Sequence, residues 1–280
     1  MLSEETIYTL RLASDPRDIL SAQRLRYRVF VEELGASGPL VDHVRRLERD
    51  DFDPLFDHLV LIDNRIPDAT GEHVVGAYRL LPVDRLPPGG RFYSEDEYDL
   101  DPLRATGRRL LELGRTCVHP DHRGGAAMFL LWNGLAEYVL ARGIEIMFGV
   151  ASFHGTDVEA LAMPLSWLHH HHLAPRDLRV RALAPGRAEM NLVAAADLSR
   201  GAAMAAMPAL IKAYLRLGGF VGDGAFVDRA FNTTDVCLLM DTARMSTRHH
   251  DFYTRKKGPQ ERHGPEGDRP GGDGAGGEGV

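Results

Sequence analysis

The chain has 280 residues, with 33 Lys and Arg against 40 Asp and Glu and a formal net charge of −7 at pH 7. A chain of this length buries a substantial core, and its acidic balance argues against general affinity for nucleic acid. Two cysteines exclude a disulfide framework, and we find neither a signal-peptide pattern nor an apolar stretch of bilayer length. We therefore expect a cytoplasmic protein.

The first predicted element is a strand over residues 6–13, where apolar and polar residues alternate. A helix is predicted over residues 14–35, because a Ser-Asp start and a nearby proline precede a helical apolar pattern that ends at a glycine. Residues 57–63 and 73–81 are predicted to form two strands. Residues 82–102 follow as a mostly polar loop.

The second half of the chain is predicted to continue with a strand over residues 109–118, a helix over 126–142 and a buried strand over 144–153. Further along, we expect a helix over residues 155–172 that breaks or kinks near Pro164, an ambiguous arginine-rich segment at 176–187, a helix over 207–219 and a last strand over 233–241. Strands and helices alternate irregularly, which indicates an α+β fold with helices on both faces of a sheet.

The C-terminal end has a different composition from the rest. From about Arg255 onward the chain is Gly, Pro and charge with almost no apolar residues. Such a segment cannot stabilise a packed structure. We predict one domain over residues 1–250 and a disordered tail over 251–280.

Charged residues interrupt two of the apolar strands. Arg79 lies in the middle of one strand, and Glu112 and Arg115 lie in another. A buried charge needs a partner, and both a structural ion pair and a catalytic site would provide one. Residues three apart in a strand point to opposite faces, so Glu112 and Arg115 can share a site only if the strand contains a bulge.

Two further sets of residues stand out near the N-terminus. Arg26 and Phe30 are four residues apart on the first predicted helix and therefore share a face. Glu48, Asp50 and Asp53 precede the second strand, where an acidic run is most often solvated charge.

Taken in order, these residues resemble a known signature. The motifs RYRVF, ERDDFD, GAYRLL and ELGR resemble those of acyl-homoserine lactone synthases. Longer stretches, among them FYSEDEYDL, LELGRTCVHPDHR, FGVASFHG and LIKAYLRLGG, are similar to the ornithine-lipid N-acyltransferases, also labelled hemolysin-like proteins. The likeness covers residues 7–242. It implies the GNAT fold, α+β with a mixed central sheet and helices on both faces.

The resemblance also implies a reaction. A 3-hydroxyacyl chain would pass from the phosphopantetheine of acyl carrier protein to the α-amine of L-ornithine and give lyso-ornithine lipid, with no other cofactor tightly bound. Peripheral contact with the inner membrane surface is an expectation for so apolar a product. The alternatives are another acceptor, such as glutamine, lysine or a homoserine-lactone precursor, and a non-catalytic protein that binds acyl carrier protein.

The chemistry requires a base and an oxyanion site. The attacking amine is mostly protonated at neutral pH, and we predict that Glu112 takes its proton, with a strand-orienting ion pair as the alternative. Beyond a bulge at Arg115, the N–H groups of Thr116, Cys117 and Val118 are predicted to stabilise the oxyanion. Cys117 is expected to be a core residue, because no suitably spaced histidine would activate its thiol.

The amino-acid acceptor offers a carboxylate and a side-chain ammonium. An arginine can bind the carboxylate, and the acidic residues can bind the ammonium group. Phe30 is expected to pack against the N-terminal region. The predicted substrate-binding set is Arg26, Phe30, Glu48, Asp50, Asp53 and Arg79. The alternative for these residues is a role in ordering the N-terminal region.

The turn before the predicted helix at 126–142 is expected to hold the donor phosphate on backbone N–H groups. The predicted donor-binding residues are Val118, Arg123, Gly124 and Gly125. Ala126 and Met128 stand where GNAT enzymes that bind coenzyme A carry glycine and glycine or alanine, respectively. The turn therefore suits the single phosphodiester of acyl carrier protein, with coenzyme A as the alternative.

Two other features concern the arginines and the histidine tract. A basic rim for an acidic carrier protein is expected from Arg104, Arg108, Arg109, Arg123, Arg142 and the arginines of residues 176–187. The tract His169 to His172 is not expected to bind metal, because consecutive side chains point around a helix instead of converging.

Overall fold

The computed structural model describes residues 7–38 and 41–244. Within them, nine strands form one sheet in the order β1-β2-β3-β5-β6-β11-β10-β8, with β9 paired to β11, and two short strands form a separate pair. The long strands are β1 (Tyr8–Leu12), β2 (Asp57–Asp63), β3 (Val74–Pro82), β5 (Leu110–Val118), β6 (Ile146–His154) and β11 (Thr233–Asp241). The short ones are β4 (Tyr98–Asp99), β7 (Arg181–Ala182), β8 (Arg187–Ala188), β9 (Phe220–Val221) and β10 (Ala225–Asp228).

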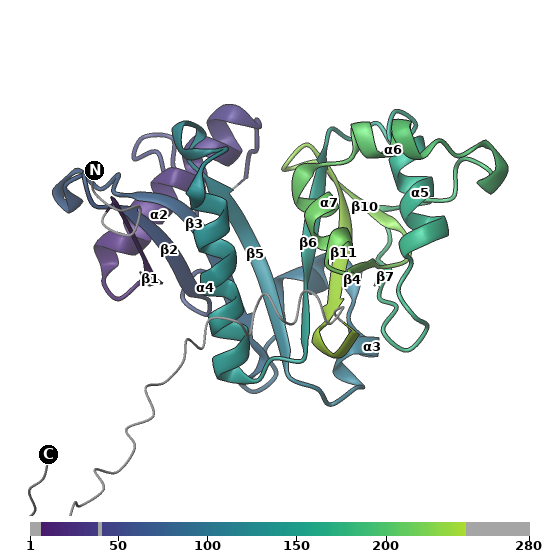
Figure 1. Cartoon of the computed structure of the whole chain (residues 1–280), viewed down its shortest axis with the longest axis horizontal. Helices are drawn as coiled ribbons and strands as arrows, with labels where there is room; N and C mark the ends of the chain where they lie inside the picture. The colour runs from purple at the N-terminus through teal and green to yellow at the C-terminus, as the bar shows by residue number, and fades with distance from the viewer. Residues whose placement is uncertain (1–6, 39–40, 245–280) are drawn as a thin grey trace, which may run out of the picture.

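Helices cover both faces of the sheet, as the sequence predicts (Figure 1). They are α2 (Pro16–Arg26), α3 (Asp101–Arg104), α4 (Ala126–Arg142), α5 (Ala162–His172), α6 (Arg200–Ala206) and α7 (Ala209–Arg216), with a π-helix η1 (Tyr27–Glu33) that continues α2. On β2, Leu59 and Leu61 pack in the cluster that contains α4, whereas Val60 packs with α2. This alternation is what a strand buried on both faces requires.

The pairing of β5 with β6 places the site. It is parallel, whereas the other paired strands of this sheet are antiparallel, and it covers only Leu110–Glu112 against Ile146–Phe148. Beyond these residues the two strands diverge (Figure 1). A Cβ on Gly149 would lie 2.2 Å from the carbonyl oxygen of Leu113, so glycine is required where the two backbones still touch.

The structure departs from the sequence prediction in some elements. Residues 155–161 form turns, and α5 begins only at Ala162, so Pro164 lies in its first turn, where proline does not kink a helix. The helix predicted over residues 14–35 is split between α2 and a π-helix. Helix α6 and strand β10 were not predicted. The predicted boundary at residue 250 falls outside the described residues.

A membrane-spanning helix is absent from residues 7–38 and 41–244, where every helix is too short or too polar to cross a bilayer.

Candidate active site

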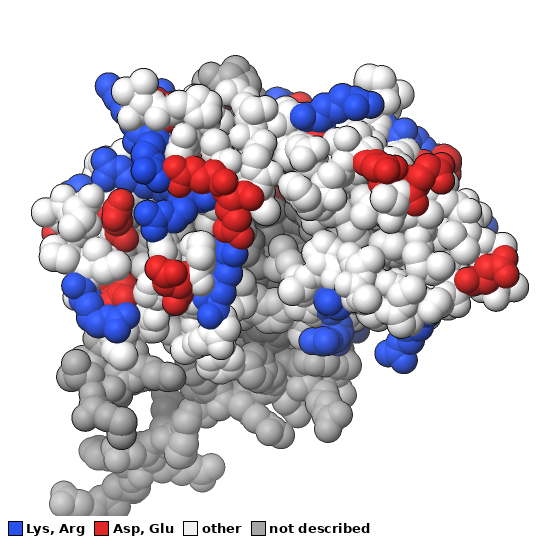
Figure 2. All heavy atoms as spheres, turned by 90° about the horizontal axis from the view of Figure 1, so that it is seen from above, with Lys and Arg blue, Asp and Glu red and all other residues white. Residues whose placement is uncertain are grey.

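A cavity of about 290 Å³ lies where β5 and β6 diverge. Its walls include residues 112–116 of β5, residues 147–152 of β6, and β11 with the loop that precedes it. Viewed from the open end of the two strands, the surface is hollowed between the two halves of the molecule (Figure 2). Apolar side chains such as Met147 and Leu238 line the cavity together with charged ones, so its shape and chemistry fit an amphipathic ligand.

The bulge that the spacing of Glu112 and Arg115 requires is present in β5. Arg79 of β3 pairs with Gly114 and Ala77 pairs with Cys117, so two residues of β5 oppose one of β3. Arg115, the first of these two, has a φ of 49°, in the left-handed region. A bulge of this kind leaves a residue outside the regular ladder and turns its neighbours. Glu112 and Arg115 both line the cavity as a result.

Six of the predicted residues form one buried ion-pair cluster: Arg26, Arg79, Arg115, Glu48, Asp50 and Asp53. Asp53 Oδ1 lies 2.6 Å from Arg26 Nη1 and 2.8 Å from Arg79 Nη1, and Arg115 Nε lies 3.0 Å from Glu48 Oε1. Burial alone would raise the pKa values of the three carboxyls, but the arginines outweigh burial and hold all three below their ordinary values. Three cations therefore balance three anions.

This balance bears on the predicted acceptor site. An arginine donates a hydrogen bond to each carboxylate oxygen of Glu48, Asp50 and Asp53. The cluster meets the cavity through Arg79 and Arg115, which line it. The pairing leaves no uncompensated negative charge in this cluster for an ammonium group.

Arg79 retains an unused hydrogen-bonding edge. Its Nε and Nη2 atoms are buried and have no hydrogen-bond partner among the described residues. The guanidinium is stacked 4.4 Å from the ring centroid of Phe56, and its Nε and Nη2 atoms are close to Gly114, where a Cβ would lie 3.8 and 3.9 Å from them. The Nε–Nη2 edge is the one that binds a carboxylate with two parallel hydrogen bonds.

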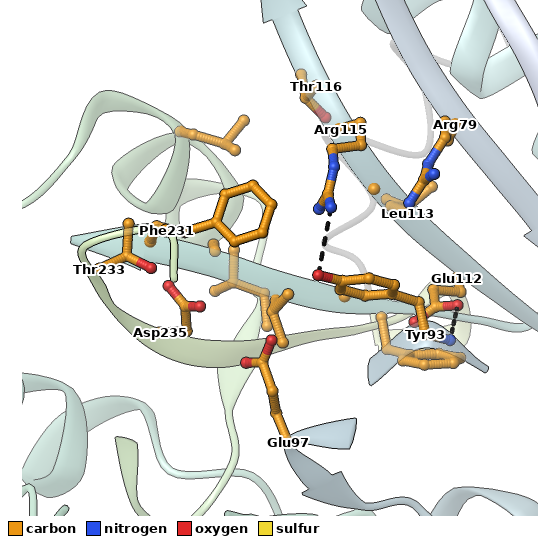
Figure 3. Close-up of a pocket in the computed structure, with 18 of the residues that line it drawn as sticks. Arg79, Tyr93, Glu97, Glu112, Leu113, Arg115, Thr116, Phe231, Thr233 and Asp235 are labelled. Atoms are coloured by element: carbon orange, nitrogen blue, oxygen red, sulfur yellow. Dashed lines mark hydrogen bonds between the residues drawn. The ribbon is translucent and has the colours of Figure 1, made fainter. Parts of the chain in front are cut away.

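Glu112 is buried in the cavity wall and is held by backbone. Tyr93 N donates to Oε2 at 2.9 Å and Ser94 N donates to Oε1 at 2.6 Å (Figure 3). Both donors belong to the 3₁₀-helix η4 (Tyr93–Asp96). Burial raises the pKa of Glu112, while these hydrogen bonds act in the opposite direction. Each oxygen keeps a second lone pair, so the carboxylate can still accept a proton.

A second group of carboxylates, absent from the predicted site, faces the same cavity. Glu97, Asp228 and Asp235 each offer an oxygen within 4.8 Å of the others. Glu97 Oε2 and Asp235 Oδ1 are buried and lack a hydrogen-bond partner within the described parts of the chain. Burial raises the pKa values of Glu97 and Asp235, and Asp235 and Asp228 raise that of Glu97 further. Asp235 is a charged residue in an apolar strand, and the same sequence pattern indicates Arg79. Glu97 lies in an acidic stretch, where a single carboxylate does not stand out.

Comparisons with known proteins agree with this architecture. Residues 25–133 match the family model of the acetyltransferase (GNAT) domain. The L-ornithine N(α)-acyltransferase of Rhodobacter capsulatus is 68% identical over 249 residues, which are 89% of this chain and 95% of that protein. The enzyme of the same name from Brucella abortus is 42% identical over 87% of this chain and 88% of its own. The chain belongs to the family of L-ornithine N(α)-acyltransferases.

The chain is thus an acyltransferase, and its fold is the GNAT fold with a mixed central sheet. A solved structure of a CoA-dependent acyl-homoserine lactone synthase aligns with a TM-score of 0.48 and 17% sequence identity, covering 88% of this chain and 87% of that one.

The turn predicted to bind the donor leads into α4 of the acyltransferase. Arg123 donates to Glu33 at 2.6 and 2.7 Å and to the carbonyl oxygen of Val118 at 3.0 Å, which fixes the turn to η1 and β5. Gly124 has a φ of 79°, and Gly125 occupies the N-cap position without a side-chain cap. The first N–H groups of α4 are therefore not capped by a side chain, as an anion site at a helix N-terminus requires.

The remaining predicted residues either line the cavity or are buried in the protein core. Phe30 and Thr116 line the cavity. Cys117 is buried, and burial raises the pKa of its thiol to about 12, which keeps it protonated and unreactive at neutral pH. Val118 is buried at the end of β5. The histidine tract ends α5, and within the described residues the atoms that converge as metal ligands belong to the three carboxylates instead.

Three residues of the predicted basic rim, Arg108, Arg109 and Arg142, lie away from the open end of the cavity. Arg108 and Arg109 precede β5, and Arg109 Nη1 donates to the carbonyl oxygen of Arg142 at the far end of α4. These residues therefore lie one strand length, about 30 Å, from the turn before α4. At the open end, basic and acidic side chains are interspersed (Figure 2). The reason is pairing, since Arg123 is bonded to Glu33.

Proposed function

We propose that this acyltransferase transfers a 3-hydroxyacyl chain from the phosphopantetheine thioester of acyl carrier protein to the α-amine of L-ornithine, giving lyso-ornithine lipid. The observation that carries the acceptor is the 68% identity, over nearly the whole chain, to a relative named L-ornithine N(α)-acyltransferase. The cavity supports it, because an acyl chain and a charged amino acid need apolar and ionic walls around one space.

The acceptor nitrogen attacks the thioester carbonyl carbon after its ammonium group loses a proton. A C–N bond forms, the C–S bond breaks, and the phosphopantetheine sulfur leaves as a thiolate that takes up a proton. Glu112 is the proposed acceptor of the ammonium proton, since its carboxylate faces the cavity and burial raises its pKa. The two N–H groups that hold it keep the carboxylate in one orientation.

Backbone groups would stabilise the charge that develops on the thioester oxygen. The bulge at Arg115 supports this assignment, because it disturbs the ladder beside Thr116, Cys117 and Val118. A positioned N–H donor of this kind typically contributes about 10²- to 10³-fold in rate.

The acceptor carboxylate is assigned to Arg79. Its Nε–Nη2 edge is buried, free of protein partners within the described residues and close to a glycine that leaves room beside it. Arg26, the other predicted fork, is fully engaged with Glu48 and Asp53.

The donor assignment rests on the turn before α4. Its uncapped N-terminus suits a phosphate group, and Ala126 and Met128 stand in place of the glycine and the glycine or alanine of a pyrophosphate turn. One phosphodiester, as in acyl carrier protein, needs fewer backbone donors than the pyrophosphate of coenzyme A.

The test is a reconstituted reaction. Purified protein, 3-hydroxyacyl carrier protein and L-ornithine are expected to give lyso-ornithine lipid, detected by mass spectrometry. The same acyl chain on coenzyme A should react at least ~10-fold more slowly in kcat/KM, which a discrimination of about 1.4 kcal/mol produces. Faster acylation of glutamine or lysine would refute the acceptor assignment, and equal use of acyl-CoA would refute the donor assignment.

A further inference from the structure

The two groups of acidic residues beside the cavity differ in charge balance. Around Arg26, Arg79 and Arg115, three carboxylates are matched by three guanidinium groups. By contrast, no ion pair within the described residues involves Glu97, Asp228 or Asp235. The second group is the place where the cavity wall lacks a cation.

The orientation of these side chains points to a ligand. Glu97 and Asp235 are 4% and 3% exposed, and each has a carboxylate oxygen without a hydrogen-bond partner in the described structure. Figure 3 shows the two carboxylates near each other at the edge of the cavity, with Thr233 beside Asp235. Burial raises the pKa of Asp235 and outweighs the hydrogen bonds from Ser152 and Thr233, which lower it. Burying unmet acceptors costs free energy, which a ligand that donates hydrogen bonds recovers.

Separate segments of the chain hold this arrangement. Glu97 follows η4, and its carbonyl oxygen accepts from Leu183 N at 2.8 Å. Asp228 ends β10 and its Oδ1 accepts from the N–H groups of Ala230 and Phe231 at 2.8 and 3.1 Å. Asp235 pairs with Ser152 near the start of β11, within the β6–β11 ladder. The carboxylates are therefore fixed by backbone before any ligand arrives.

We propose that Glu97, Asp228 and Asp235 form the binding site for the side-chain ammonium group of a diamino-acid acceptor. An ammonium group has three N–H donors in tetrahedral directions. Three acceptors about 2.9 Å from one nitrogen in those directions stand about 4.7 Å apart, within the 4.8 Å that separates these oxygens at most.

The assignment rests on the proposed function and sharpens it. Arg79 would bind the carboxylate of the acceptor and the three acidic residues would bind its side-chain ammonium group. The α-amine then remains free to react. The raised pKa values of Glu97 and Asp235 describe the empty site, and a bound cation would favour their ionised forms. The three carboxylates have no cationic partner among the residues that the structure describes. They would therefore favour an amino acid with a cationic side chain over one with an uncharged side chain.

The test compares L-ornithine with L-norvaline, which has the same carbon chain without the δ-amine. In the native protein, kcat/KM for ornithine should exceed that for norvaline by at least ~100-fold, because a site built around an N–H donor rejects the analogue that lacks it. The Asp235→Asn and Glu97→Gln variants should each lower this ratio at least ~10-fold, mainly by losing ornithine. Glu137→Gln, an exposed change on α4, is the matched control and should leave the ratio unchanged.

Binding provides a readout without the acyl donor. By calorimetry, the Kd for ornithine should rise at least ~10-fold in Asp235→Asn while the Kd for norvaline stays the same, as expected when one charge-assisted hydrogen bond is lost. An unchanged ornithine-to-norvaline ratio in both variants overturns the proposal, as does a ratio that changes only in Asp50→Asn. So does Mg²⁺ binding that Asp235→Asn abolishes without any effect on ornithine.

The two levels of inference fail differently. If the native protein turns over ornithine and the variants keep their preference, the ammonium site is wrong and the proposed function stands. If the native protein binds ornithine through Asp235 but does not acylate it from acyl carrier protein, the proposed function is wrong and the ammonium site stands.

Discussion

Glu112 has a proposed catalytic role as the general base and a structural role as the hydrogen-bond acceptor for η4. In Glu112→Gln, an amide N–H₂ replaces one carboxylate oxygen and faces a backbone N–H, so one buried donor loses its acceptor. We expect the free energy of unfolding to fall by about 1–3 kcal/mol. If Glu112 also takes the proton, kcat should fall by at least ~100-fold, since general bases typically contribute 10²- to 10⁴-fold.

The measurements are urea unfolding and the pH dependence of kcat/KM. Loss of the acidic limb of the native pH profile identifies the base, because a merely structural change would leave that limb in place. A variant that is less stable but retains near-native kcat would remove Glu112 from the chemistry. Glu137→Gln serves as the control for the substitution itself.

At the level of single residues, the sequence gives part of the site. Arg79, Glu112 and Arg115 can be found because a charge inside an apolar strand must have a partner. Asp235 meets the same condition less clearly, because it follows two threonines at the start of its strand. Glu97 could not be found in this way, because it is one of several acidic residues in a loop and only the folded contacts distinguish it.

The turn before α4 allows a matched test of backbone conformation. Gly124 has a φ of 79°, in the region that strains a side chain, whereas Gly125 has a φ of −108° and accepts one. Neither glycine has an atom within 4 Å of an added Cβ, so sterics do not distinguish them. Gly124→Ser should therefore destabilise the protein by about 1 kcal/mol.

Gly125→Ser is the partner experiment, because serine at an N-cap position accepts a hydrogen bond from the helix. The free energy of unfolding should stay level or rise by a few tenths of a kcal/mol. Equal losses in the two variants, measured by urea unfolding, would contradict the left-handed conformation of Gly124.

At the level of elements, local patterns predicted the long strands and α4 with nearly correct ends. Strand β2, strand β11 and helix α4 have the predicted bounds, because alternation, β-branched residues and a terminal glycine all agree there. Helix α6 was overlooked because its alanine-rich seven residues carry little amphipathic pattern. Strand β10 is similarly short, and its place in the sheet depends on tertiary pairing with β8 and β11.

At the level of the whole molecule, the site exists because β5 and β6 pair over three residues and then separate. The resemblance of the sequence implied this fold, but no local pattern states where two parallel strands diverge. The close contact of Gly149 with Leu113 marks the point. The empty space beyond it exposes Glu97 and Asp235 to each other, so the arrangement that suits a cationic acceptor destabilises the protein without one.

This conflict predicts how stability depends on pH. Glu97 has a raised pKa in the folded protein compared with the ordinary 4.5, so above pH 4.5 the unfolded chain releases its proton first. Folded-state stability is full below that pH and declines as the pH rises through the raised pKa. Glu97 and Asp235 titrate as a pair, and each proton difference contributes a slope of about 1.4 kcal/mol per pH unit.

Glu97→Gln lacks this titrating group, a change of about one proton in the difference between the two states. Its free energy of unfolding should therefore decline less steeply than that of the native protein between about pH 5 and pH 8. Urea unfolding at several pH values measures the two slopes, and parallel curves would contradict the assignment. Added ornithine should then stabilise the native protein more than the variant, since a ligand stabilises the state to which it binds. We expect Glu97→Gln to be more stable than the native protein without ligand and to bind ornithine more weakly. This combination is typical of binding-site residues that lower the stability of the fold.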